Sequence, residues 1–156
     1  MERPLTLGDY ASLAELRYQI RRFLHFSEQA SRTAGLEPRQ HQLMLALKGL
    51  PTNVRPRIGE LAERLQVRHH SAVELVNRLS AGGYVQRRRG GEDGREVLLS
   101  LTPKGEKVLG ELSLHHRAEL RMRGPALIEA LRRVLHVSKR GNGVPAKAAS
   151  RARRKT

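Results

Sequence analysis

Arginine side chains bracket a glycine-rich segment in the middle of the chain. Arg87, Arg88 and Arg89 precede the stretch 90–94 (Gly-Gly-Glu-Asp-Gly), and Arg95 follows it. Guanidinium groups bind phosphates and base edges through planar, charged N–H donors. The pattern indicates a basic hairpin whose tip could enter the minor groove of DNA, where the negative potential is enhanced. The alternative is a solvated hairpin whose charges prevent strand pairing between molecules.

A second group of polar residues shares one face of a helix predicted from about His69 to Ala81. Ala72, Leu75, Val76 and Leu79 have helical spacing and should face the core. The opposite face is then polar, and the major groove of DNA is wide enough to admit a helix. The candidate base or phosphate contacts are Arg68, His69, His70, Ser71, Glu74, Asn77 and Arg78. The alternative is an exposed polar face without a ligand.

The elements that position these residues follow from hydrophobic periodicity and from glycine and proline punctuation. Helices are predicted over 6–34, from Pro38 to about Gly49, from Arg57 to Leu65, and over 69–81. Two strands, 85–89 and 96–101, flank the glycine-rich turn. Helix, turn, helix and hairpin occur in that order over residues 57–101. This order is the layout of a winged helix-turn-helix.

The first helix shows one apolar stripe, and Thr6 or Asp9 could cap its start. We expect the stripe to be buried, and Gly35 to end the helix. A helix of this length at the end of a small chain is often shared with a partner chain. The stripe consists of Leu13, Leu16, Ile20, Phe23 and Leu24.

The C-terminal third of the chain predicts two more helices. Thr102 and Pro103 have the types expected at a helix start, and Gly124-Pro125 is expected to break the helix. A last helix should run to about residue 138. The fold class is therefore mainly α, with about six helices plus a β-hairpin wing.

Composition narrows the function. The chain of 156 residues carries 30 Lys and Arg against 15 Asp and Glu, a formal net charge of +15. Such a charge attracts polyanions, above all nucleic acid. Residues 139–156 hold seven basic and no acidic side chains, and they predict a disordered basic tail. Residues 1–138 keep a net charge of about +8 without that tail.

The absence of cysteine excludes disulfides and thiolate metal sites within the chain. No signal peptide and no apolar run long enough for a membrane helix is visible. We therefore expect a cytoplasmic, nucleoid-associated protein without a membrane partner. No His-Glu-x-x-His, phosphate loop or cysteine nucleophile indicates an enzyme or a cofactor.

Three segments resemble the MarR family of winged helix-turn-helix transcription regulators. The stretch Ile58-Gly59-Glu60-Leu61-Ala62-Glu63-Arg64-Leu65 is similar to the family's helix-turn-helix opening, as is Leu75-Val76-Asn77-Arg78-Leu79 followed by Gly83-Tyr84-Val85. The strongest likeness is Asp93-Gly94-Arg95 with Val97, Leu99, Leu101-Thr102 and Gly105, which resembles the family's wing signature. The similarity covers about residues 10–136 and is sharpest over 58–105.

The resemblance implies one MarR-like domain over residues 1–138. It implies a homodimer through helices 6–34 and 103–138, and a DNA-binding lobe at 57–101. It also implies recognition of a pseudo-palindromic operator in double-stranded DNA, usually as a repressor. By family analogy, Arg95 reaches the minor groove and Asp93 braces the wing. Arg57 stands where the family often has a Ser or Thr cap, and His69-His70 replace smaller residues.

The resemblance further implies a cleft for a small aromatic anion near the dimer helices. The cleft candidates are Tyr18, Arg21, Arg22, His25 and His41. Some relatives bind zinc in this region, and His25, His41, His115 and His116 lie on the corresponding helices. No close His-x-x-x-His pair occurs among these four, so structural or surface roles are favoured over a metal site or a pH response.

Three alternatives to a sequence-specific regulator stay open. The first is a non-specific DNA- or chromatin-associated basic protein, whose binding would fall steeply with salt at every sequence. The second is a metal-responsive regulator that uses the cleft histidines. The third is a protein–protein adaptor that uses this fold without DNA.

Overall fold

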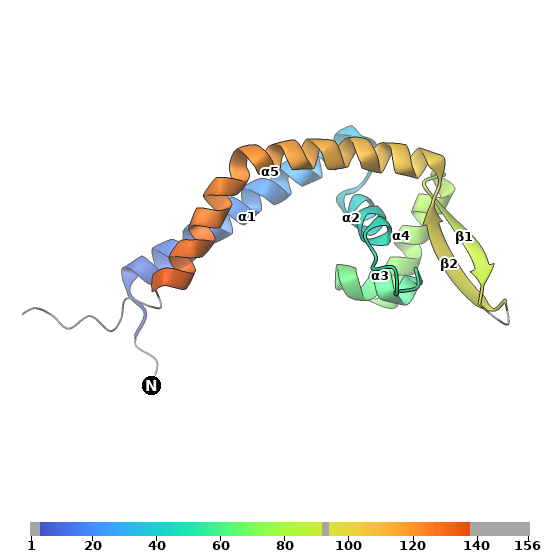
Figure 1. Cartoon of the computed structure of the whole chain (residues 1–156), viewed down its shortest axis with the longest axis horizontal. Helices are drawn as coiled ribbons and strands as arrows, with labels where there is room; N and C mark the ends of the chain where they lie inside the picture. Colours follow the sequence, from blue (N-terminus) through green and yellow to red (C-terminus); the bar gives the residue numbers. More distant parts are fainter. Residues whose placement is uncertain (1–3, 92–93, 138–156) are drawn as a thin grey trace, which may run out of the picture. The chain divides into compact units, whose positions relative to one another are not determined.

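The computed structural model describes residues 4–91 and 94–137. Within these ranges it contains five helices and two strands (Figure 1). The elements in chain order are α1 (Leu7–Thr33), α2 (Pro38–Lys48), α3 (Ile58–Leu65), α4 (His69–Ala81), β1 (Val85–Gly90), β2 (Glu96–Leu101) and α5 (Pro103–Val137). This is the mainly helical, winged arrangement that the sequence predicts. None of the described helices is long and apolar enough to span a membrane.

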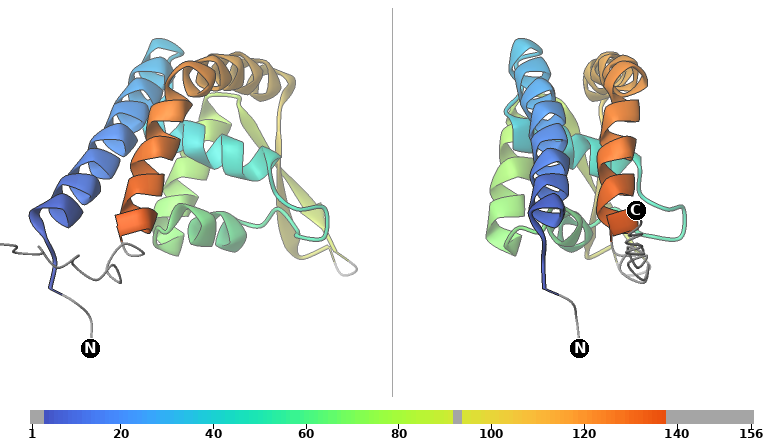
Figure 2. Two further views of the ribbon diagram at one scale, coloured as in Figure 1. Left: turned by 60° about the vertical axis from the view of Figure 1, so that its left-hand side comes forward. Right: turned by 90° about the vertical axis from the view of Figure 1, so that its left-hand side faces the viewer.

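The chain divides into two units, each described by itself. One contains residues 1–20 and 125–156, and the other contains residues 21–124. Both long helices, α1 and α5, contribute a segment to each unit (Figure 2). The elements predicted to read DNA all belong to unit 21–124.

The expected break at Gly124-Pro125 is wrong. Helix α5 runs from Pro103 to Val137 with Pro125 inside it. Proline lacks only one backbone N–H, so it costs the helix one i→i−4 hydrogen bond. The helical turns on both sides keep theirs, and five helices replace the six expected.

The ends of α1 form as the sequence predicts. The Thr6 hydroxyl accepts from the Asp9 backbone N–H at 3.3 Å, and the Asp9 carboxylate accepts from the Thr6 N–H at 2.7 Å. Both candidate residues therefore cap the helix together. At the other end Gly35 has a φ of 81°, and the Leu36 N–H donates to the Ser31 carbonyl at 2.9 Å. This left-handed turn stops the helix.

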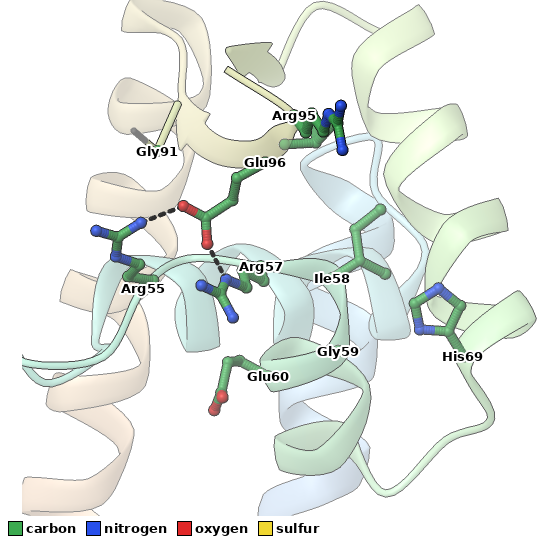
Figure 3. A pocket seen from close by; sticks show the side chains of 10 residues that line it. Arg55, Arg57, Ile58, Gly59, Glu60, His69, Gly91, Arg95 and Glu96 are labelled. Atoms are coloured by element: carbon green, nitrogen blue, oxygen red, sulfur yellow. Dashed lines mark hydrogen bonds and ion pairs between the residues drawn. The ribbon is translucent and has the colours of Figure 1, made fainter. Parts of the chain in front are cut away.

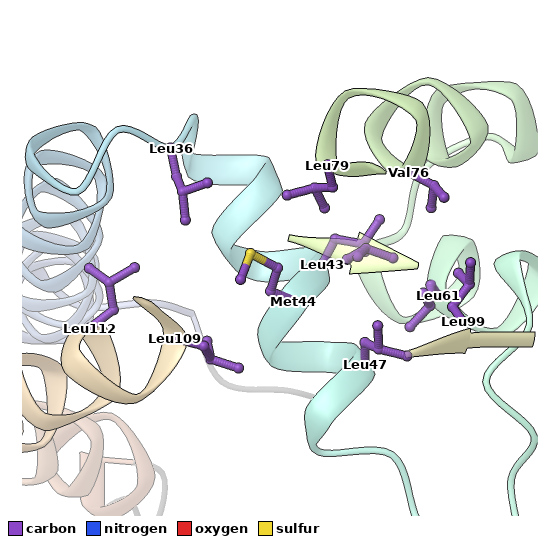
Figure 4. Close-up of a cluster of buried hydrophobic side chains, with 11 residues drawn as sticks. Leu36, Leu43, Met44, Leu47, Leu61, Val76, Leu79, Leu99, Leu109 and Leu112 are labelled. Carbon is purple, nitrogen blue, oxygen red and sulfur yellow. The ribbon is translucent and has the colours of Figure 1, made fainter. Parts of the chain in front are cut away.

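The core of unit 21–124 surrounds α2 (Figure 4). Leu43 and Met44 are fully buried, together with Leu61 of α3 and with Val76 and Leu79 of α4. Strand residues Val85 and Leu99 and the α5 residues Leu109 and Leu112 complete the same cluster. The apolar positions predicted for α3 and α4 are confirmed as its inward face.

The apolar stripe of α1 is not buried within this chain. The exposed fractions are 43% for Leu13, 38% for Ile20 and 44% for Leu24. The expectation of burial is wrong for the single chain. Helical periodicity shows that an apolar stripe packs against another apolar surface. It does not show whether that surface belongs to the same chain.

Strands β1 and β2 form an antiparallel hairpin whose register runs from Val85↔Leu101 to Gly90↔Glu96. The start of α5 docks on the residue just before this hairpin. A Cβ at Gly105 would lie 2.1 Å from the Tyr84 carbonyl oxygen, so only glycine fits. The Thr102 N–H donates to the same carbonyl at 3.0 Å. This close approach fixes α5 against the hairpin within the unit.

Substituting Gly105 therefore tests the packing. Gly105→Ala should lower the free energy of unfolding by about 1–3 kcal/mol, because backbone must move to admit the methyl group. Gly110→Ala on the same helix is the matched control, since nothing lies within 4 Å of its Cβ position. It should raise stability by up to about 1 kcal/mol, because alanine favours helix over glycine. Urea unfolding at one protein concentration measures both, and a stabilising Gly105→Ala would contradict the fold.

Candidate nucleic-acid interface

Helix α4 presents the predicted polar face to solvent. His69, His70, Glu74, Asn77 and Arg78 are exposed, and Ser71 is half-buried. Arg68 is exposed at the N-cap, with an extended backbone. The polar face points to solvent because the opposite face of the helix, with Ala72, Val76 and Leu79, is fully buried. A DNA contact by these side chains remains a prediction, but their exposure agrees with it.

The hairpin divides the three consecutive arginines between its two faces, because successive strand residues point to opposite sides. Arg87 pairs with Leu99 and Arg89 with Val97, so these arginines share the face that carries the buried Leu99. Arg88 pairs with Leu98 and lies on the other face. All three are exposed. The basic run is therefore not one continuous patch.

One hydrogen bond joins the hairpin to α4. The Arg87 guanidinium donates from Nη2 to Oδ1 of Asn77 at 2.6 Å. Two predicted contact residues from different elements are thus brought together. The bond occupies the amide oxygen of Asn77 and leaves its N–H donors for another partner.

An open groove of about 1010 Å³ lies between the start of α3 and the hairpin (Figure 3). Its lining includes the predicted residues Arg95 and His69. It also includes Arg55 and Arg57, which precede α3, and Glu96, the first residue of β2. The groove therefore brings one predicted residue of the hairpin and one of α4 to the same surface.

Glu96 forms ion pairs with both arginines that precede α3. Its Oε2 contacts Arg55 Nη1, and its Oε1 contacts Arg57 Nε (Figure 3). Sequence reasoning missed this group and treated Arg57 only as an unusual helix cap. The available signal was Glu96 itself, an acidic residue directly after Arg95 in a strongly basic hairpin. Asp93, which the family resemblance assigns to bracing the wing, lies outside the described residues, as does the predicted tail at 139–156.

A pair of histidines, His41 buried and His116 half-buried, lies where the cleft residues were expected. The rings of His41 and His116 are 4.8 Å apart, and His41 is only 3% exposed. His116 has both ring nitrogens within 2.7 Å of an oxygen, the Leu112 carbonyl at Nδ1 and the Ser27 hydroxyl at Nε2. Since a carbonyl only accepts, Nδ1 carries the proton. Burial, with a contribution from His116, lowers the pKa of His41 to about 4.

The other cleft candidates are more exposed than His41. Tyr18, Arg21 and His25 are exposed, and Arg22 is half-buried. In the described part of the chain, no three His, Asp or Glu side chains gather closely enough to hold a metal ion. The metal-responsive alternative therefore gains no support from the described histidines.

Comparison with known proteins agrees with this geometry. Residues 34–96 match the model of the MarR family. No match is found among curated proteins. The fold is similar to AbsC, a MarR family transcriptional regulator from Streptomyces coelicolor, with 20% identity, a TM-score of 0.65 and coverage of 78% of this chain and 82% of that one.

Two further solved structures share the fold. A MarR family protein from Bacillus stearothermophilus has 20% identity and a TM-score of 0.66, covering 87% of this chain and 99% of that one. A MarR family transcriptional regulator from Silicibacter pomeroyi has 24% identity and a TM-score of 0.60, with coverage of 86% and 96%.

The exposed polar helix beside an arginine-bearing hairpin is the arrangement of a winged helix-turn-helix fold. Residues 34–96, which match the MarR family model, span α2 to the first residue of β2, and the solved MarR family structures share the fold of this chain.

The histidine pair predicts a pH-dependent stability. His41 has a folded-state pKa near 4 and an ordinary value of 6.5, so the unfolded chain binds more protons between these pH values. The contribution of His41 to the free energy of unfolding is complete above about pH 6.5 and is lost as the pH falls toward 4. The total loss is about 3 kcal/mol. His41→Gln, which cannot titrate, should show a smaller fall in unfolding free energy between pH 7 and pH 4.5. Equal losses in both proteins, measured by urea unfolding, would contradict the assignment.

Proposed function

We propose that the chain is a homodimeric repressor that binds a pseudo-palindromic operator through residues 57–101. The observation that carries the proposal is the meeting of two exposed elements on unit 21–124. The polar face of α4 and the arginines of β1 are joined there by the Arg87–Asn77 hydrogen bond. A helix in the major groove would then place the hairpin at the adjacent minor groove.

Exposed apolar side chains support the homodimer. Monomeric proteins rarely leave large apolar surfaces in water, and such surfaces usually mark an interface. Several side chains of α1 and α5 are at least two-fifths exposed in the single chain. They are Leu7, Tyr10, Leu13, Leu24, Leu114, Leu120, Met122, Ile128, Leu131 and Leu135. A second copy of the chain, whose α1 and α5 carry the same apolar residues, is the natural cover.

A twofold symmetric dimer implies the form of the binding site. Two copies of α4 would enter two major grooves about one helical turn apart or a multiple of it, so the half-sites should be inverted repeats. Repression follows if the operator overlaps a promoter, because a bound dimer excludes the polymerase. A small aromatic anion could oppose binding by favouring a dimer with a different spacing between its recognition helices. Tyr18, Arg21, Arg22, His25 and His41 remain the candidate residues for such an effector.

Competition binding tests the proposal against non-specific association. The net charge of about +8 on residues 1–138 favours that second candidate. Random-site selection with the purified full chain should return an inverted repeat. At 150 mM salt the selected site should compete at least about 10³-fold better than random DNA. Equal competition would establish a non-specific binder, and no binding even at low salt would establish an adaptor.

Arg95→Ala tests the hairpin as a reader of DNA. The variant should bind the selected site at least about tenfold more weakly, because each protomer loses one charged groove contact. Arg132→Ala, which removes an exposed arginine of α5 outside residues 57–101, is the matched control for charge. Sedimentation should show the same dimer for both variants. An Arg95→Ala protein with the affinity of the control would show that the wing does not read DNA.

A further inference from the structure

The ion pairs of Glu96 connect the end of the hairpin next to its turn to the segment that leads into α3. Glu96 opens β2, and its side chain is 13% exposed, against 57% for Arg55 and 55% for Arg57. Each carboxylate oxygen faces a different arginine, so one acidic side chain holds two basic ones. These ion pairs join the hairpin to a segment about forty residues earlier in the chain.

The backbone of the same segment supports this arrangement. The Leu99 N–H of β2 donates to the Pro56 carbonyl at 2.9 Å. Segment 55–57 therefore lies along the edge of β2 that does not pair with β1. Arg55 and Arg57 flank Pro56, and the Arg57 N–H donates to the Arg55 carbonyl at 2.8 Å, which closes a three-residue turn and keeps the two arginines close together. Both guanidinium groups can therefore reach the single carboxylate at the start of the strand.

We propose that Glu96 is a positioning and specificity-determining residue of the DNA-binding lobe. It fixes the turn end of β2 on segment 55–57 and so sets the direction of its neighbour Arg95. It also withholds Arg55 and Arg57 from the phosphate backbone, where free arginines would bind any sequence. The inference rests on the proposed function, because it concerns how specificity at that interface arises.

Both effects act on specificity in the same direction. Loss of the carboxylate would release the wing and weaken the contact of Arg95 with the selected site. It would also free two guanidinium groups on the groove surface to bind phosphate. Affinity for the selected site then falls while affinity for random DNA rises, so the ratio of the two decreases.

Glu96→Gln is the direct test, with Glu106→Gln as the matched control. Glu106 is also an acidic residue in an ion pair, with Lys48 Nζ at 2.8 Å, but it does not line the groove. Affinities of the full-length dimer for the selected site and for random DNA are measured over a range of salt concentrations. Glu96→Gln should lower the specificity ratio about tenfold and steepen the salt dependence for random DNA by about one or more counterions. Glu106→Gln should change the specificity ratio and the salt dependence for random DNA less than Glu96→Gln does.

Two further variants separate positioning from charge. Arg55→Gln/Arg57→Gln removes the partners of Glu96, so it should weaken binding to the selected site without raising affinity for random DNA. This double variant also tests the proposal if Glu96→Gln fails to fold. In an Arg95→Ala background, Glu96→Gln should cause little further loss at the selected site, because the residue that it positions is gone.

The outcomes distinguish this inference from the proposed function. A wild-type chain without sequence preference would overturn the proposed function itself. A specific wild-type chain whose Glu96→Gln variant behaves like Glu106→Gln would overturn only the inference. An undiminished loss from Glu96→Gln in the Arg95→Ala background would overturn the positioning role.

Discussion

A two-stranded hairpin is marginally stable by itself, so the wing depends on what holds its base. Val85 and Leu99 are buried in the core of unit 21–124, and Pro56 accepts a hydrogen bond from β2. Glu96 adds two ion pairs at the point where the strand begins. The buried residues hold the base and middle of the hairpin, and the ion pairs of Glu96 hold β2 at the end next to the turn. The arginines of β1 stay exposed, so the hairpin is fixed while its basic side chains are accessible.

The same core supports the recognition helix. Leu43 and Met44 of α2 pack in one cluster with Val76 and Leu79 of α4 and with Leu99 of β2. Helix and wing therefore share one support, and neither can shift without disturbing the other. Direct coupling through Arg87 and Asn77 strengthens this connection. Under the proposed function, such a lobe would present a fixed pattern of donors to DNA, and its affinity would depend on which sequence carries the matching acceptors.

Local patterns in the sequence predict most of the lobe. The bounds of α4 follow from the spacing of Ala72, Val76 and Leu79 and from Gly83, whose φ of 77° ends the helix. Contacts between residues far apart in the sequence could not be predicted from local patterns. The ion pairs of Glu96 join residues about forty positions apart, and no periodicity indicates them. The predicted break at Pro125 was wrong because a long helix tolerates one missing hydrogen bond. The predicted burial of the α1 stripe was wrong for the single chain because periodicity does not show which surface packs on the stripe.

Site-directed cleavage of DNA tests whether α4 and the hairpin lie in the grooves of the operator. The chain has no cysteine, so His70→Cys on α4 and Val97→Cys on β2 each give one attachment point for an iron chelate. On the selected operator, each derivative should make two symmetric cuts. Cuts from position 70 should lie at the half-site centres, and cuts from position 97 should lie in the flanking minor grooves. Uniform cleavage along the DNA, or no cleavage from either position, would contradict a role of α4 and the hairpin in reading DNA.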